Sequence, residues 1–202
     1  MIVLDIEATG TNPSKHSILA IGAVDLAHAE HTFYGECRAW EGAHIMEEAL
    51  AVNGFSLSAV KDPAKQSEAE LVRQFLAWSD DLDDRTLAAQ NVAFDAAFLQ
   101  AACERAGVAY PFAHRTIDVH SVVYTHILLS GKQPPFDAHH RHSALSLDAA
   151  RAYVGLPSEP TPHNALEGAL GHAEVLHRIW FGKGFAPRYA SYPVPEYCAR
   201  PN

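Results

Sequence analysis

Three strand-like segments occupy the first 38 residues, and no helix-length pattern separates them. Residues 2–6 and 17–24 are nearly continuous apolar runs, and residues 31–37 form the third segment. Turn formers fill residues 8–15, between the first two segments. A parallel pair of strands would need a crossover of a dozen or more residues, so the sequence predicts an antiparallel meander.

After residue 40 the pattern changes to helices that alternate with short strands. Ser67, followed three residues later by Glu70, has the sequence of a capping box and indicates a helix start. Asn53-Gly54 and Gly107 are typical helix ends. The expected helices are 46–52, one beginning at 67, 94–105, one ending near 129, 145–153 and 165–180, the further strands are 86–89 and 115–118, and 131–141 is expected to be a loop. This order predicts an α/β fold with a mixed five-stranded sheet, three antiparallel strands and then parallel ones, flanked by helices.

Length and composition favour one main domain. A chain of 202 residues with 48% apolar and 19% charged residues can bury a substantial core, which excludes general disorder. We expect a domain over residues 1–182 and a tail over 183–202, rich in proline and tyrosine, that lies extended on the surface. No apolar run approaches the length of a membrane span, no signal-peptide pattern opens the chain, and the three cysteines are widely spaced. These features predict a cytoplasmic protein with reduced thiols and no membrane contact.

Two carboxylates stand in the first predicted strand, which is otherwise apolar. Asp5 and Glu7 are two residues apart, so their side chains share one face at the strand's exit into a glycine turn. Like charges this close raise each other's proton affinity unless a cation lies between them. The pair is therefore either two solvated carboxylates at a strand end or part of a divalent-metal site, since hard cations take oxygen ligands.

Two further segments carry polar residues at element boundaries. Asp95 follows a strand at the start of a helix, near the sheet edge where α/β proteins bind ligands. His163 precedes the helix that carries Glu167 in its first turn. Taken singly, Asp95 is equally well explained as a favourable charge at a helix N-terminus, and a lone histidine there is more often structural than catalytic.

Together these segments resemble a known family. Residues 5–10 (DIEATG), 18–24 (ILAIGAV), 91–95 (NVAFD) and 163–166 (HNAL) occur in the same order as in the DEDDh 3′→5′ exonucleases, a group that includes DnaQ-like proofreading subunits, oligoribonucleases and RNase T. The likeness extends from residue 1 to about residue 180. It implies an RNase H-like fold and a catalytic site with two Mg²⁺ or Mn²⁺ ions.

The resemblance also implies a role for individual residues. Asp5, Glu7 and Asp95 would bind the two ions, with Asp5 bridging them. His163 would accept a proton from the attacking water, a role that suits imidazole near neutral pH. The resemblance places Ala8, Thr9 and Gly10 at the terminal sugar. We also expect Asn53, Phe55 and Asn91 to contact the substrate; Phe55 either stacks on the terminal base or has an ordinary core role.

The chain departs from the family pattern at two positions. The last metal-binding aspartate of the family falls five residues after the histidine, where this chain has Gly168. We expect Glu167 to replace it as catalytic residue and metal ligand, although adjacent helix positions point about 100° apart. Gln90 stands where the family usually has a histidine. If Glu167 does not reach the metal, the alternative is a weakened or inactive nuclease-like domain that binds nucleic acid or a protein partner.

These features predict a metal-dependent 3′→5′ exonuclease that releases nucleoside 5′-monophosphates. The formal net charge of −9 argues against a grip on long duplex, so single-stranded DNA or RNA 3′ ends, or short oligonucleotides, are the expected partners. Two further alternatives are a subunit that docks a protein partner through the C-terminal tail and a homodimer. His139, His140 and His142 in the predicted loop are either a solvated cluster or a Zn²⁺ or Ni²⁺ site.

Overall fold

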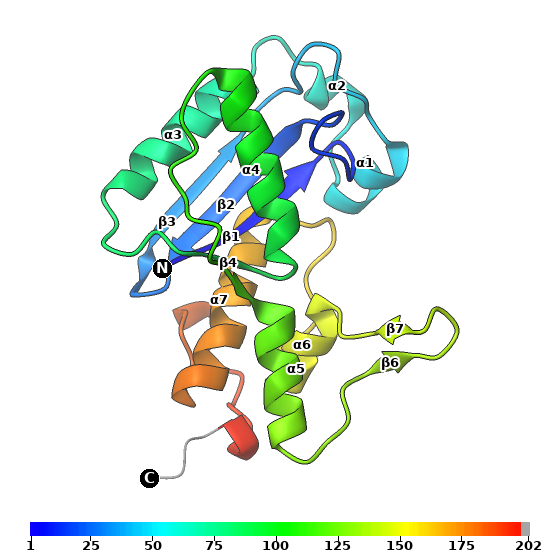
Figure 1. Cartoon of the computed structure of the whole chain (residues 1–202), viewed down its shortest axis with the longest axis vertical. Coiled ribbons are helices and arrows are strands. Elements are labelled where there is room, and N and C mark those ends of the chain that lie inside the picture. The colour runs from blue at the N-terminus through cyan, green and yellow to red at the C-terminus, as the bar shows by residue number, and fades with distance from the viewer. Residues whose placement is uncertain (199–202) are drawn as a thin grey trace.

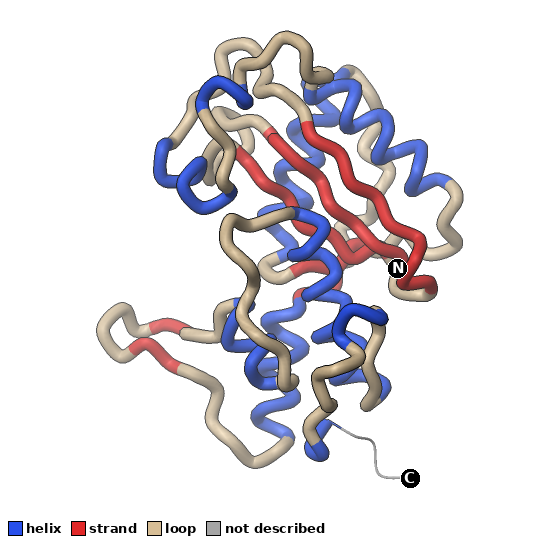
Figure 2. The backbone as a smooth tube through the Cα atoms, turned by 180° about the vertical axis from the view of Figure 1, so that it is seen from behind, coloured by secondary structure: helices blue, strands red, loops and turns tan. Residues whose placement is uncertain are grey.

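The computed structural model describes residues 1–198 and centres on a five-stranded sheet with strand order β3-β2-β1-β4-β5. The expected antiparallel meander is confirmed: β1 (Ile2–Ala8) pairs with β2 (Ile18–Asp25), and β2 pairs with β3 (His28–Glu36). The short strands β4 (Leu87–Ala89) and β5 (Ile117–Asp118) extend the sheet in parallel from β1. The three long strands lie side by side in Figure 2.

Alternating residues of β1 serve two separate cores, one on each face of the sheet. Ile2, Leu4 and Ile6 pack on one face with residues of α3 (Glu68–Asp80) and α4 (Val92–Ala106). Val3 packs on the other face with residues of α5 (Val119–Leu129), α6 (Leu147–Tyr153) and α7 (Ala165–Phe181). Figure 1 shows α3 and α4 lying over the strands, with α7 behind them. Side chains at positions 5 and 7 therefore face the α7 side.

The helix boundaries follow the local signals in the sequence. The hydroxyl of Ser67 accepts the N–H of Glu70, whose carboxylate accepts the N–H of Ser67, so the predicted capping box is present at α3. Gly54 and Gly107 adopt left-handed φ angles of 74° and 65° after α1 (Glu47–Asn53) and α4, which glycine tolerates without strain. The four-residue helix α2 (Leu57–Val60) was not predicted, because one helical turn is too short to show a period.

The predicted loop 131–141 instead contains half of a small hairpin. Two-residue strands β6 (Phe136–Asp137) and β7 (His142–Ser143) pair in antiparallel fashion and project from the body of the molecule (Figure 1). Among the described residues, no helix is both long and apolar enough to cross a membrane.

The C-terminal segment is packed into the second core, which corrects the expectation of an extended surface tail. Two single-turn 3₁₀ helices, η1 (Pro187–Tyr189) and η2 (Glu196–Cys198), bring buried Ala186, Tyr189 and Cys198 against α7. The predicted tail continues through 199–202, which lie outside the described residues.

Two buried charged residues of α7 hold this segment by its main chain. The Glu174 carboxylate accepts the N–H groups of Phe185 and Ala186. Arg178, paired with Glu174 at 2.7 Å, donates to backbone carbonyls that include those of Tyr192 and Pro193. Both side chains are at most 1% exposed, so each charge depends on the other and on these main-chain partners.

We predict that Glu174→Gln lowers the free energy of unfolding by about 3 kcal/mol, because it leaves the Arg178 charge buried without its counter-ion. Asp80→Asn is the matched control: Asp80 pairs with Arg85 on the surface, where an ion pair contributes less than about 1 kcal/mol. Urea unfolding followed by circular dichroism measures both. Equal effects of the two substitutions would contradict a structural role for the buried pair.

Candidate active site

The candidate active site begins on β1, which carries the first two carboxylates. Asp5 lies opposite Gly22 of β2, and Glu7 lies opposite Ala20. Asp5 is half-buried, and Glu7 is 8% exposed. Because both occupy odd positions of the strand, both side chains lie on the face covered by α7, as the period of the sequence predicted.

Helix α7 approaches this end of the sheet at van der Waals distance. A Cβ atom on Gly22 would overlap the backbone of Ala165 and Leu166 at the start of α7, and one on Gly168 would overlap the carboxylate of Asp5. The first turn of α7 is fixed by the Asn164 side chain, which accepts the N–H groups of residues 166 and 167. The absence of side chains at the two glycines therefore sets the close contact of helix and sheet.

His163 is placed by the same helix start and by a contact with α1. It directly precedes the capping residue Asn164, and its backbone N–H donates to the carbonyl of Val52 at 3.2 Å. Its side chain is partly exposed. The imidazole thus stands at the mouth of the region that holds Glu7, with α1 on its other side.

Asp95 enters from the opposite face of the sheet. It lies in the first turn of α4 and is 3% exposed. Asn91, directly before α4, adopts a left-handed conformation with φ 57°, which asparagine tolerates better than most residues. Its side chain makes no capping bond and is exposed.

The pKa values of all three carboxylates are raised. Burial raises the pKa of Asp5 well above its usual range, and the charges of Asp95 and Glu7 raise it further. Burial likewise raises the pKa of Glu7 to about 7, although the nearby His163 acts to lower this pKa. Burial also raises the pKa of Asp95, with Glu7 contributing. Such a cluster of oxygen donors holds protons unless hard cations replace them, so its chemistry fits divalent ions of the Mg²⁺ or Mn²⁺ type.

A cavity of about 220 Å³ joins Glu7 and His163 to residues of β2, β3, α1 and the start of α7. Asn53 and Phe55, predicted to contact substrate, both line it. The Asn53 amide is buried and donates to the Ala8 carbonyl at 3.1 Å, which ties the end of α1 to the end of β1. The sequence reasoning did not identify Tyr34 and Glu36, which line the same cavity from β3; their i, i+2 spacing was the available signal.

The turn after β1 has its own internal packing. The Thr9 hydroxyl is buried, donates to the His44 carbonyl at 2.7 Å and accepts the N–H of Ser17. A Cβ on Gly10 would overlap the imidazole of His16, so the packing of His16 leaves no space for a side chain at position 10. Ala8, Thr9 and Gly10 stay proposed substrate contacts through their backbone.

Glu167 forms an ion pair with Arg188 of the C-terminal segment in this structure. Gly168 is the residue of α7 whose Cβ position lies against the Asp5 carboxylate. The role of Glu167 as a metal ligand stays a prediction.

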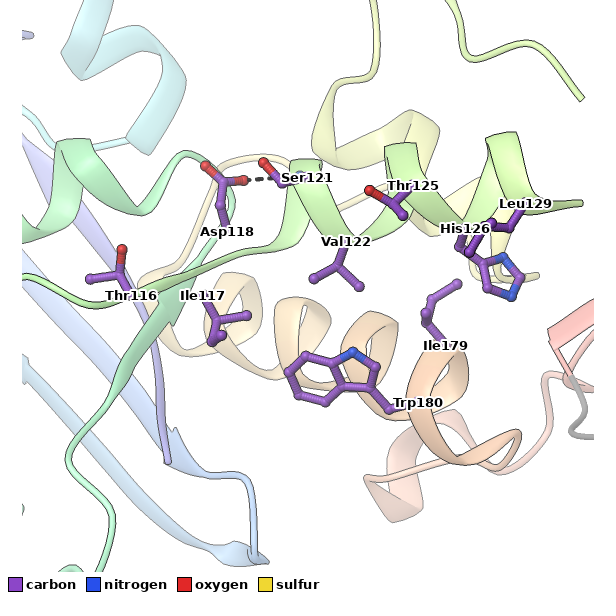
Figure 3. Close-up of a pocket in the computed structure, with 10 residues that line it drawn as sticks. All are labelled: Thr116, Ile117, Asp118, Ser121, Val122, Thr125, His126, Leu129, Ile179 and Trp180. Atoms are coloured by element: carbon purple, nitrogen blue, oxygen red, sulfur yellow. Dashed lines mark hydrogen bonds between the residues drawn. The ribbon is translucent and has the colours of Figure 1, made fainter.

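Two further candidate sites involve other residues, although the charge of Asp118 contributes to the raised pKa of Asp95. Asp118 caps α5 by accepting the N–H of Ser121, and it lines an apolar groove of about 550 Å³ between α5 and α7 (Figure 3). On the projecting hairpin, Asp137, His140 and His142 place ligand atoms within 4.8 Å of one another, a spacing that a transition-metal ion can use. His139 is not part of that group.

Comparisons with known proteins identify the family. The exonuclease model named RNase_T matches residues 2–176. The chain belongs to this exonuclease family. Ribonuclease T of Klebsiella pneumoniae is 30% identical over 169 residues, covering 71% of this chain and 77% of that protein. Ribonuclease T of Haemophilus influenzae is 26% identical, covering 71% and 72%.

Solved structures of DEDDh exonucleases share the fold. The nuclease domain of 3′hExo, bound to rAMP, superposes with a TM-score of 0.66 at 16% identity, over 88% of this chain and 90% of that domain. Exonuclease I of E. coli with a dT13 oligonucleotide gives 0.67 at 14% identity, over 88% of this chain and 40% of that protein. The predicted RNase H-like fold and the DnaQ-like 3′→5′ exonuclease family are therefore confirmed, and divalent-metal dependence is general to this family.

For this exonuclease we predict that Mn²⁺ raises the melting temperature strongly at pH 8 and weakly at pH 6. Glu7 has a pKa of about 7 when folded and an ordinary value of 4.5. Between pH 4.5 and pH 7, Glu7 holds a proton in the metal-free folded state that it has released in the unfolded chain. This proton stabilises the folded state, and the stabilisation is lost as the pH rises through 7. The metal must displace that proton, so its apparent affinity falls about tenfold per pH unit below 7.

Thermal unfolding with and without Mn²⁺ at the two pH values measures the effect, and EDTA reverses it. Asp5→Asn serves as the control, because it removes a metal ligand and should abolish the response at both pH values. A Mn²⁺-induced shift of equal size at pH 6 and pH 8 would contradict the proton competition.

Proposed function

We propose that this exonuclease removes nucleotides from the 3′ ends of single-stranded nucleic acid or short oligonucleotides and releases nucleoside 5′-monophosphates. The observation that carries the proposal is the convergence of Asp5, Glu7 and Asp95 beside a cavity lined by Glu7 and His163. When bound, two divalent ions supply Lewis-acid activation of water and stabilise charge on the leaving oxygen. Asp5, Glu7 and Asp95 would hold these ions.

His163 acts as the general base. Its imidazole lines the cavity with Glu7, so it can accept the proton of the attacking water at a ring nitrogen. The backbone bond from His163 to Val52 and the capped start of α7 restrict where this ring can lie. The proton then leaves the cavity through the exposed side of the ring.

The surface next to the cavity supports a single-stranded substrate. A second hollow of about 640 Å³ shares Phe55 with the first and is lined by Ile45, Leu50, Leu57 and Lys61. The Lys65 ammonium lies 5.0 Å from the centre of the Phe55 ring. An aromatic ring with nearby cations favours an unstacked base and its phosphate. The related structures were solved with rAMP and with dT13, which supports a role in binding single-stranded 3′ ends.

The packed C-terminal segment weakens the alternative of a docking tail. Main-chain groups of this segment are bonded to Glu174 and Arg178, so the segment is part of the fold as far as residue 198. The alternative of an inactive domain rested on Gly168, and the test below decides it.

A labelled oligonucleotide assay tests the proposal. With Mn²⁺ or Mg²⁺, a 5′-labelled single strand should shorten one nucleotide at a time and release 5′-monophosphates, and EDTA should stop the reaction. The same strand carrying a 3′-terminal phosphate serves as a blocked-end control. Metal binding without any shortening of DNA or RNA strands would favour the inactive alternative.

We predict that His163→Ala lowers kcat on the order of 100-fold or more, because it removes the general base. Mn²⁺ affinity, measured by isothermal titration calorimetry, should stay unchanged, because the carboxylates are intact. A parallel loss of metal binding and activity would place His163 among the ligands instead.

We predict that Phe55→Ala raises KM by roughly tenfold with a smaller change in kcat, because base stacking contributes about 1–3 kcal/mol. Phe136→Ala is the matched control: this ring is 64% exposed on the projecting hairpin. Steady-state kinetics on a short single strand measures both variants. A KM effect of equal size at Phe136 would refute a specific stacking role for Phe55.

A further inference from the structure

The hairpin of β6 and β7 gathers three potential metal ligands beside its turn (Figure 1). Asp137, His140 and His142 each offer one ligand atom, and these atoms lie within 4.8 Å of one another. Asp137 ends β6, and His142 begins β7 directly opposite it in the antiparallel pair. His140 lies in the turn between them. The chain reversal therefore brings together side chains from both strands and from the turn.

The backbone of the turn fixes the orientation of the Asp137 carboxylate. Its Oδ1 atom accepts the N–H groups of His139 and His140 at 2.8 and 2.9 Å. The Asp137 carbonyl accepts the N–H of Arg141 at 2.8 Å. The second carboxylate oxygen, Oδ2, lies 2.7 Å from Nδ1 of His140. The oxygen that the backbone does not use is thus directed at an imidazole.

His142 is held in a tautomer that suits a metal ligand. Its Nδ1 atom lies 2.8 Å from the backbone carbonyl of Ser143, which can only accept, so Nδ1 carries the proton. In the neutral ring, Nε2 then keeps its lone pair. Histidines that bind metals commonly donate their second ring N–H to a carbonyl in this way. The ring of His142 is also within 18° of parallel to that of His140, at 5.7 Å between ring centres.

The spacing of the ligand atoms suits a tetrahedral ion after small side-chain rotations. Zn²⁺ binds imidazole nitrogen and carboxylate oxygen at about 2.0–2.2 Å, so neighbouring ligand atoms lie roughly 3.3 Å apart. The 2.7 Å pair of Asp137 and His140 would open by roughly 0.6 Å as the metal replaces the proton between them. The widest pair would close from at most 4.8 Å. Both histidines are exposed, which leaves their rings free to make these rotations.

The donor set favours a transition metal over Mg²⁺. Two imidazoles and one carboxylate suit ions such as Zn²⁺ and Ni²⁺, whereas Mg²⁺ prefers oxygen ligands and keeps several waters. The hairpin therefore differs in donor chemistry from the carboxylates of the candidate active site. Three protein ligands leave the fourth position of a tetrahedral ion for water.

We propose that Asp137, His140 and His142 form a second metal site, which binds Zn²⁺ or a similar transition-metal ion and cross-links the two strands of the hairpin. The proposal goes beyond the exonuclease function and does not depend on it. Two-residue strands are marginally stable on their own, and Phe136 is 64% exposed, so packing contributes little to the hairpin. An ion bound by both strands and the turn supplies the stabilisation that a core supplies elsewhere.

Titration of Zn²⁺ into the full 202-residue chain tests the assignment, with excess Mg²⁺ present to occupy the active-site carboxylates. Calorimetry gives the affinity and the number of ions bound. His140→Ala and Asp137→Asn should each weaken Zn²⁺ binding by roughly 100-fold or more, since each removes one of three protein ligands. His139→Ala is the matched control: this exposed histidine lies next to the group but outside it, so the variant should bind as the wild type does.

Trypsin cleavage after Arg141 provides a second measurement. Arg141 is exposed in the turn between the two histidines. In the wild type, Zn²⁺ at about ten times its Kd should slow this cleavage roughly tenfold, because the bound ion opposes opening of the turn. In His140→Ala the cleavage rate should not change with Zn²⁺, and this variant also corrects for any direct effect of Zn²⁺ on the protease.

Three results would overturn the assignment. A wild-type chain that binds no Zn²⁺ in excess Mg²⁺ would refute the site. Equal weakening by His139→Ala and His140→Ala would indicate unspecific attraction to a histidine-rich turn. Zn²⁺ binding that is lost in Asp5→Asn and kept in His140→Ala would place the ion at the active-site carboxylates. None of these results decides whether the chain is a nuclease, which the oligonucleotide assay tests separately.

Discussion

The close contact between α7 and the antiparallel strands β1 and β2 is the constraint on which the candidate active site depends. Gly22 of β2 has no side chain where it faces the α7 backbone, and Gly168 of α7 has none where it faces Asp5. These two glycines allow the contact. Moving the helix outward by the width of a methyl group would displace His163, which immediately precedes its capping residue. The same contact explains why the active site is assembled from segments far apart in sequence: one strand supplies Asp5 and Glu7, and the helix start delivers the imidazole beside them.

A second constraint is electrostatic. Burying several carboxylates together is unfavourable, and the raised pKa values of Asp5, Glu7 and Asp95 record that cost in the metal-free fold. The cost is tolerated because the cluster is small and the rest of the sheet is apolar and well buried. Bound divalent ions would convert this repulsion into attraction, which is the electrostatic basis of the proposed metal site.

Much of this architecture was predictable because the signals are local. The meander follows from strand patterns without an intervening helix, and the shared face of Asp5 and Glu7 follows from the two-residue period of a strand. The packed C-terminal segment was not predictable, because main-chain bonds to Glu174 and Arg178 hold it and its own sequence has no apolar period. The hairpin was missed because two-residue strands show no alternation.

The fourth carboxylate illustrates the limit of reasoning from spacing. Family spacing pointed to position 168, and the nearest acidic residue in sequence was Glu167, but proximity along a helix does not give proximity in direction. In the structure the Glu167 carboxylate pairs with Arg188, whereas Gly168 packs against the Asp5 carboxylate. What a metal site constrains is the location of negative charge, and spacing along the chain does not give that location by itself.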